Sequence, residues 1–172
     1  MSRKKKVVRN IIILIVLSIL TFTRGIYLTP IAAHEASERS IHYGPSKVVH
    51  IEDFDGGKYI LCKYDKWISC NTINRTMYFF WTFGNQVTGI EVDKEKPLNF
   101  TWSHSNDRYK IYGIINDNNI NRVELHLEDG TTLSQTKFYD DNMFLFTWEG
   151  ESGIGDVKAY DSQGNILFED YR

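Results

Sequence analysis

The chain opens with a basic stretch that leads into an apolar segment. Met1–Lys6 contains four cations, and Ile11–Phe22 consists of Ile, Leu, Val and Phe interrupted only by Ser18 and Thr21. A helix of a soluble protein normally shows a polar face, and Ile11–Leu17 has none. The pattern therefore predicts an N-terminal membrane helix.

Two interpretations of this segment stay open. In the first, residues 7–28 form an uncleaved single-pass signal-anchor, with Arg9 and Arg24 reaching toward the lipid headgroups and Tyr27 at the outer interface. In the second, the segment is a leader that is cleaved, and the protein is secreted. The lack of a clear small-residue cleavage site favours the anchor. In both, the basic residues before the apolar segment keep the N-terminus in the cytoplasm and the rest outside the cell membrane.

A short amphipathic helix is expected next, over Pro30–Ile41. Thr29 suits the N-cap and Pro30 the first helical position, and the Gly44-Pro45 pair follows the end of the helix. The apolar stripe of this segment is narrow, so we expect the helix to lie on a surface.

From Lys47 onward the pattern changes to short aromatic and β-branched runs separated by turns. Lys58–Tyr64 and Trp67–Thr72 flank Asp65-Lys66, which indicates a hairpin. Thr76–Phe83 is apolar at both odd and even positions, which predicts a central strand covered on both faces. A further strand is expected over Val87–Val92.

After a charged connector that contains Pro97, the alternation becomes cleaner. Leu98, Phe100 and Trp102 share one face, and later runs recur every ~8–12 residues with turn signals such as Glu128–Gly130 between them. This spacing is typical of a small antiparallel β-sandwich-like module.

The expected fold class is therefore mostly β (α+β). A membrane helix and a short amphipathic helix precede antiparallel β-hairpins and the sandwich-like module. The corresponding regions are a cytoplasmic basic stub with the signal-anchor, the helix with the hairpin region, and the module (1–28, 29–96 and 97–172).

Composition adds two limits. The chain has 172 residues, of which 42% are hydrophobic and 14% aromatic, enough to build a core. Residues 1–24 hold six cations and no acid, so the other 148 residues carry 14 cations against 22 acids, a net charge of −8. An acidic body lacks the positive surface that phosphate backbones require, which excludes nucleic acid as an expected partner.

The C-terminal half resembles the β module of small exported or membrane-anchored β-rich proteins of Gram-positive bacteria. The residues that carry this resemblance are Tyr112-Gly113, Ile115, Ile120, Val123, Asp129-Gly130, Phe144, Trp148, Ala159–Asp161, Gly164 and Leu167. With the helix and hairpin upstream, it covers most of residues 30–172. Since these positions are glycines, turns and core residues, the resemblance implies a fold and no catalytic residue.

Cys62 and Cys70 are candidates for a disulfide. They are symmetric about Lys66, so a three-residue loop places them opposite each other across the hairpin, within bridging range. In an exported protein an even cysteine count favours that bond. A two-residue loop shifts the register and leaves two buried thiols instead. Neither cysteine has further ligands at a usable spacing, so no metal ion or cofactor is expected.

Aromatic side chains are the remaining candidates for ligand contact. Trp81, Trp102 and Trp148 could stack on a glycan or line a peptide groove, although a small sandwich also needs large side chains in its core. The five histidines are scattered, and we expect them at the surface.

The sequence contains no nucleophile elbow and no phosphate-binding loop, so no catalytic residue is assigned. It predicts a membrane-tethered extracytoplasmic binding or interaction module without catalytic activity. The expected partners are the lipid bilayer, through residues 7–28, and an envelope protein or glycan. Two alternatives stay open: a small cell-envelope hydrolase that uses an acid pair, and an extracellular sensor or inhibitor that acts by β-strand addition.

Overall fold

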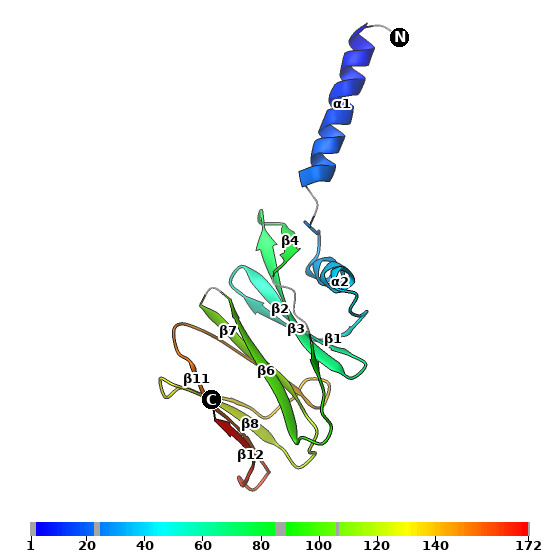
Figure 1. Cartoon of the computed structure of the whole chain (residues 1–172). Coiled ribbons are helices and arrows are strands. Elements are labelled where there is room, and N and C mark those ends of the chain that lie inside the picture. The colour runs from blue at the N-terminus through cyan, green and yellow to red at the C-terminus, as the bar shows by residue number, and fades with distance from the viewer. Residues whose placement is uncertain (1–2, 23–24, 85–88, 106, 172) are drawn as a thin grey trace.

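The computed structural model of the chain describes residues 3–22, 25–84, 89–105 and 107–171 (Figure 1). Its helices are α1 (Arg3–Phe22) and α2 (Pro30–Ser40). The strands are β1 (Lys47–Phe54), β2 (Gly57–Tyr64), β3 (Trp67–Thr76), β4 (Phe80–Phe83), β5 (Ile90–Glu91), β6 (Leu98–Ser105), β7 (Arg108–Ile115), β8 (Arg122–Leu127), β9 (Thr132–Gln135), β10 (Met143–Glu149), β11 (Ile154–Tyr160) and β12 (Ile166–Tyr171). The predicted mostly β class is confirmed.

The strands form three antiparallel sheets. Sheet A has the order β1-β2-β3-β4, with β5 also paired to β3. Sheet B has the order β10-β7-β6, and sheet C the order β12-β11-β8-β9. The three-residue Glu128–Gly130 turn joins β8 to β9, and Gly130 supplies the left-handed conformation there, with φ +87°.

Sheet B is the middle layer of the body. One of its faces packs on sheet C through a core that includes Ile111, Phe144 and Val123. Its other face packs on sheet A through Tyr112, Leu145 and other buried residues. The far face of sheet A is covered by α2. In Figure 1 the layers follow one another from α2 to sheet C, with α1 beyond α2.

Because sheet B is covered on both faces, its central strand is buried at odd and even positions alike. Lys110 to Ile115 of β7 are all buried. Gly113 is required here, since a Cβ at this position would lie 2.4 Å from the Asn99 carbonyl oxygen and from the Phe144 ring. The two-sided burial expected of Thr76–Phe83 is therefore found in β7.

The strand predicted over Thr76–Phe83 is wrong in its first half. Met77, Tyr78 and Phe79 form the tip of the β3–β4 hairpin, and Tyr78 is 89% exposed. Met77 and Tyr78 adopt left-handed φ values of 47° and 63°, which reverse the chain so that Thr76 pairs with Phe80. Odd and even positions are both apolar here because Met77–Phe79 form an exposed tip. They do not belong to a strand that is buried on both faces.

The strand expected over Val87–Val92 is limited to β5. Its neighbouring residues 85–88 lie outside the described residues, so that part of the prediction has no structural counterpart to compare.

The N-terminal membrane helix is not supported. The segment does form helix α1, which extends away from the sheets (Figure 1). Within the described ranges, however, no helix combines the length and the apolar character needed to cross a bilayer. The basic residues that the sequence places before the apolar segment are part of the same helix, from Arg3 to Arg9.

The start of α2 agrees with the sequence. Thr29 is the N-cap, its hydroxyl accepts a hydrogen bond of 3.1 Å from the Ala32 amide, and Pro30 follows it. The face that packs on sheet A differs from the expected apolar stripe, since its buried residues are Ala33, His34, Ser37 and Glu38. The prediction that histidines lie at the surface is thus wrong for His34.

The disulfide between Cys62 and Cys70 is not formed, and both thiols are free and buried. Tyr64 pairs with Trp67, so the loop has two residues, and Cys62 faces Ser69 in the register. Cys62 belongs to the core beneath α2, whereas Cys70 belongs to the core between sheets A and B. Residues that differ by one position in register point to opposite faces of a sheet, which prevents the bond.

The burial of both thiols predicts their reactivity. We expect the native full chain to leave a disulfide reagent such as DTNB unreacted at pH 8, because burial raises the pKa of Cys62 to about 12 and also that of Cys70. After unfolding in denaturant without reductant, two thiols per chain should react. A result of zero thiols in the unfolded protein would contradict the register of β2 and β3.

Candidate functional site

The three candidate tryptophans occupy different environments. Trp81 is buried in the core beneath α2, with the Arg75 guanidinium 5.2 Å from its ring centroid. It cannot serve as a ligand platform in this fold, and that part of the prediction is wrong. Trp102 is 40% exposed, and Trp148 is partly buried against the core between sheets B and C.

Trp102 and Trp148 belong to one stacked series of four rings on sheet B, which we call the aromatic row (Trp102, His104, Tyr109 and Trp148). Successive ring centroids lie 5.9, 5.7 and 5.2 Å apart. The planes of neighbouring rings differ by 23°, 22° and 12°. The rings stack because the register places His104 opposite Tyr109, and Tyr109 opposite Trp148, on three adjacent strands. Stacked neighbours cover each other's faces, so the exposed ring face left for a ligand is that of Trp102, at the end of the row.

The aromatic row lies on the face of sheet B that packs on sheet C, at the end where this face becomes exposed to solvent. Along β6 the same face carries Leu98, which is buried, then Phe100, which is half-buried, and then the exposed Trp102. The indole N–H of Trp148 donates a hydrogen bond of 3.0 Å to the Ser152 carbonyl, which fixes that ring. Partly exposed Trp and Tyr side chains at the edge of a core are frequent in recognition sites.

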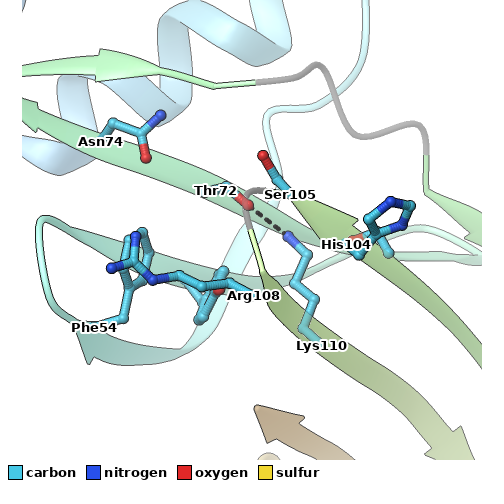
Figure 2. A pocket seen from close by; sticks show the side chains of 9 residues that line it. Phe54, Thr72, Asn74, His104, Ser105, Arg108 and Lys110 are labelled. Carbon is cyan, nitrogen blue, oxygen red and sulfur yellow. Dashed lines mark hydrogen bonds between the residues drawn. The ribbon is translucent and has the colours of Figure 1, made fainter. Parts of the chain in front are cut away.

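A small polar pocket of about 50 Å³ adjoins the aromatic row (Figure 2). It lies between sheet A and the β6–β7 hairpin, and His104 belongs both to the row and to the pocket. None of its nine lining residues is a carboxylate, in a body that is acidic overall: Phe54, Tyr59, Thr72, Asn74, Ser103, His104, Ser105, Arg108 and Lys110.

Lys110 is the most unusual residue of this pocket. It is 3% exposed, and its ammonium donates to the Cys70 carbonyl at 2.5 Å and to the Thr72 hydroxyl at 2.8 Å (Figure 2). The ring of Tyr59 lies 5.0 Å away. Burial lowers the pKa of Lys110, and no carboxylate forms an ion pair with it anywhere in the described ranges.

The other cation of the pocket is already paired. The Arg108 guanidinium donates to Glu149 at 2.8 Å and lies 4.9 Å from the centroid of the Phe54 ring. An ammonium has three N–H donors, so Lys110 keeps one beyond its two neutral oxygen partners. The pocket therefore offers one buried positive charge that lacks an anion.

A second group of polar side chains lies beneath α2. His34, Glu38 and Cys62 are buried, and their ligand-type atoms lie within 4.8 Å of one another. This group is not predicted from the sequence, because His34 is expected at the surface and neither cysteine has a further ligand at a usable spacing along the chain. The signal that could have indicated half of it is the His34-x-x-x-Glu38 spacing, which puts both side chains on one helix face.

The structure bears on both alternative functions, a hydrolase with an acid pair and a sensor or inhibitor that acts by β-strand addition. The pocket of Figure 2 has no carboxylate in its lining, so it does not supply an acid pair. Among the described strands, β12 is an edge of sheet C whose one partner is β11, and its side chains Ile166 and Tyr171 are exposed. Strand addition would use an edge of this kind.

The lowered pKa of Lys110 predicts a pH dependence of stability. The pKa of Lys110 is lower in the folded state than in the unfolded chain, so the folded protein releases this proton at a lower pH. The free energy of unfolding therefore increases as the pH rises from the folded pKa toward 10.5, the ordinary value for lysine. We expect the free energy of unfolding of the wild type, relative to Lys110→Met, to increase between pH 7 and pH 10. The exposed Lys137→Met is the control, and its difference from the wild type should not change with pH. Denaturant titrations at each pH measure both; equal slopes for the two variants would contradict the prediction.

Comparison with known proteins adds no relative: neither a protein-family model nor a curated protein nor a solved structure matches this chain. The resemblance to small exported or membrane-anchored proteins of Gram-positive bacteria stays a prediction from the sequence.

Proposed function

We propose that the protein is a membrane-attached, extracytoplasmic module that binds an acidic polysaccharide through the aromatic row and the Lys110 pocket. The observation that carries this proposal is the continuity of the two features, since His104 belongs to both. The row lies on the face of sheet B toward sheet C and Lys110 on the face toward sheet A, so a ligand that uses both would pass over the β6–β7 hairpin at His104. Such a ligand needs both a ring face and an anionic group.

Each half of the site recognises one part of such a ligand. The apolar face of a sugar ring stacks on an aromatic face, here the exposed side of Trp102 at the end of the row. A carboxylate or phosphate on the sugar would accept the remaining N–H of Lys110, a charge-assisted hydrogen bond stronger than a neutral one. The pocket volume of about 50 Å³ admits such a group but not a sugar ring.

The acidic body makes the site selective. Residues 25–172 carry a net charge of −8, so an anionic polymer is repelled from most of the surface. The Lys110 pocket, which has no carboxylate in its lining, is a place where that repulsion is relieved. Neutral sugars would stack on the row without using the cation, and should bind more weakly.

Membrane attachment is supported by α1 and its surroundings. Apolar side chains from Val7 to Ile19 are exposed all round α1, and large exposed apolar surfaces typically mark a membrane or partner contact. The basic residues at the start of the helix suit the cytoplasmic side. We propose that α1 is embedded in the bilayer from Val7 onward and that the body, which includes Tyr27, lies outside the cell membrane.

The body contributes a second contact on the same side. Just after α1 the backbone of Tyr27 exchanges two hydrogen bonds with Trp81 of β4, at 2.7 and 2.8 Å. This ties the end of the embedded segment to the β3–β4 hairpin, whose exposed tip holds Met77, Tyr78 and Phe79 (Figure 1). Aromatic side chains are favoured at the headgroup level, so the tip would rest on the membrane surface.

Ligand binding is tested with matched carbohydrates. We expect the tryptophan fluorescence of the full chain in detergent to titrate with oligogalacturonate, and its methyl ester, which keeps the rings and loses the charge, to bind at least tenfold more weakly. Trp102→Ala should weaken oligogalacturonate binding roughly 10–30-fold. Lys110→Met should weaken it roughly 10–100-fold and abolish the preference for the acid over the ester.

The controls separate this site from the rest of the molecule. Trp67→Phe and Lys137→Met change other members of the same residue types and should leave binding unchanged. A phosphate-substituted oligosaccharide in place of the uronate distinguishes the two sources of the anionic group. If neither acidic ligand binds more tightly than the neutral ester, the proposed ligand class is wrong.

Attachment is tested in cells that express the full chain. We expect the protein to remain in the membrane fraction after a carbonate wash, and external protease to remove the body from intact cells. The double variant Leu14→Asp, Leu17→Asp should shift most of the protein out of that fraction, because charged groups are costly in lipid, about 2.5–3.5 kcal/mol each at the centre of a helix. Intact mass distinguishes an uncleaved anchor from a cleaved leader. A body that is spared by protease while an external control protein is digested would contradict the topology.

A further inference from the structure

Beneath α2, on the far side of sheet A from the Lys110 pocket, three side chains that bind metals in other proteins converge. His34 and Glu38 come from successive turns of α2, and Cys62 comes from β2. Their exposed fractions are 1%, 4% and 0%. Histidine Nε2 lies 3.3 Å from Glu38 Oε1 and 3.4 Å from Cys62 Sγ.

We propose that His34, Glu38 and Cys62 form a binding site for a divalent metal ion of the zinc type. The inference is independent of the polysaccharide site and of membrane attachment, because it uses none of their residues.

The spacing suits tetrahedral coordination. Zinc binds His nitrogen and carboxylate oxygen at about 2.0–2.2 Å and thiolate sulfur at about 2.3 Å. Tetrahedral angles then place the ligand atoms about 3.4–3.6 Å apart. The two separations that involve His34 Nε2, 3.3 and 3.4 Å, are close to these values. An ion could therefore enter with only small side-chain movements.

The charges also suit a dication. A carboxylate and a thiolate together carry two negative charges, and the neutral imidazole adds none, so a bound divalent ion gives a buried site without net charge. The ion would displace the thiol proton of Cys62 to solvent. In the part of the chain that the structure describes, the ion-pair partner found for Glu38 is His34 itself.

Neighbouring polar groups already hold the ligands in place. The Asn71 amide lies 2.8 Å from His34 Nδ1, which directs Nε2 toward Cys62 and Glu38. When a metal occupies Nε2, Nδ1 carries a proton, and a half-turn of the Asn71 amide presents its oxygen as the acceptor. The Ser46 amide donates to Glu38 Oε2 at 3.2 Å, and the Ser46 hydroxyl donates to Oε1. Metal-binding histidines and carboxylates are typically oriented by partners of this kind.

The fourth position faces a pocket. His34, Glu38 and Ser46 line a pocket of about 630 Å³ between α2 and the segment that follows it. The other charged or titratable groups in its lining are Glu35, Arg39, His42 and Tyr43, and Arg39 pairs with Glu35 at 3.7 Å. Three protein ligands with a fourth position beside a pocket are typical of a metal centre that keeps one coordination site for water or another ligand, rather than of a closed structural one.

The same atoms could be interpreted as a cysteine nucleophile with its histidine base and an asparagine. The thiol is fully buried, whereas a nucleophilic cysteine must be accessible to its substrate. The arrangement therefore favours metal binding.

The test uses Co²⁺ with the full chain in detergent, purified with reductant and stripped with a chelator. We expect one Co²⁺ per chain, a thiolate-to-cobalt charge-transfer band and the visible bands of four-coordinate cobalt, all removed by Zn²⁺. Cys62→Ser should lose the charge-transfer band. Glu38→Gln, which preserves the shape of the side chain, should lose tight binding, and Asn71→Ala should weaken it roughly 10–100-fold.

Cys70→Ser is the matched control, since Cys70 is the other buried thiol and lies on the opposite face of sheet A from Cys62. It should bind Co²⁺ as the wild type does. The wild-type spectrum needs no variant, so the test stands even if Cys62→Ser fails to fold. Absence of a charge-transfer band in the wild type, its loss in Cys70→Ser, or stoichiometric alkylation of Cys62 by iodoacetamide in the native protein would overturn the proposal.

Discussion

Sheet B must be covered on both of its faces, and the rest of the body is arranged around that requirement. Strand β7 is buried from Lys110 to Ile115, so it needs a partner layer on each side. Sheet C covers one face and sheet A the other, and α2 then covers the outer face of sheet A. Each added layer creates another interface, where any polar side chain must find a partner away from water.

The two sites arise at such interfaces. Lys110 lies between sheets A and B and reaches across to the Cys70 carbonyl and the Thr72 hydroxyl of β3. His34 and Glu38 lie between α2 and sheet A, next to Cys62. In both places a charged or titratable side chain is buried at an interface that apolar side chains could also fill. Buried titratable groups of this kind are commonly found at ligand-binding and metal-binding sites.

Membrane attachment and ligand binding are proposed for different parts of the molecule. Helix α1, the Tyr27–Trp81 bridge and the hairpin tip at Met77–Phe79 lie on one side, and the C-terminal sheet lies farthest from them (Figure 1). The aromatic row belongs to sheet B, in the middle of the stack, where the covering sheet no longer shields Trp102. Attachment and ligand binding would therefore use different surfaces of the body.

Local patterns by themselves determined the mostly β class, the start of α2 at Thr29-Pro30 and the hairpin turn at Asp129-Gly130. These features depend on backbone conformation and alternation over a few residues, which the chain specifies locally. Only the tertiary structure decided that Cys62 and Cys70 face different cores, since either loop length was compatible with Asp65-Lys66. It also decided that Met77–Phe79 forms an exposed tip, that Trp81 is core, and that His34 joins Glu38 and Cys62. Those outcomes depend on which layer packs against which face, and residues far apart in sequence set that choice.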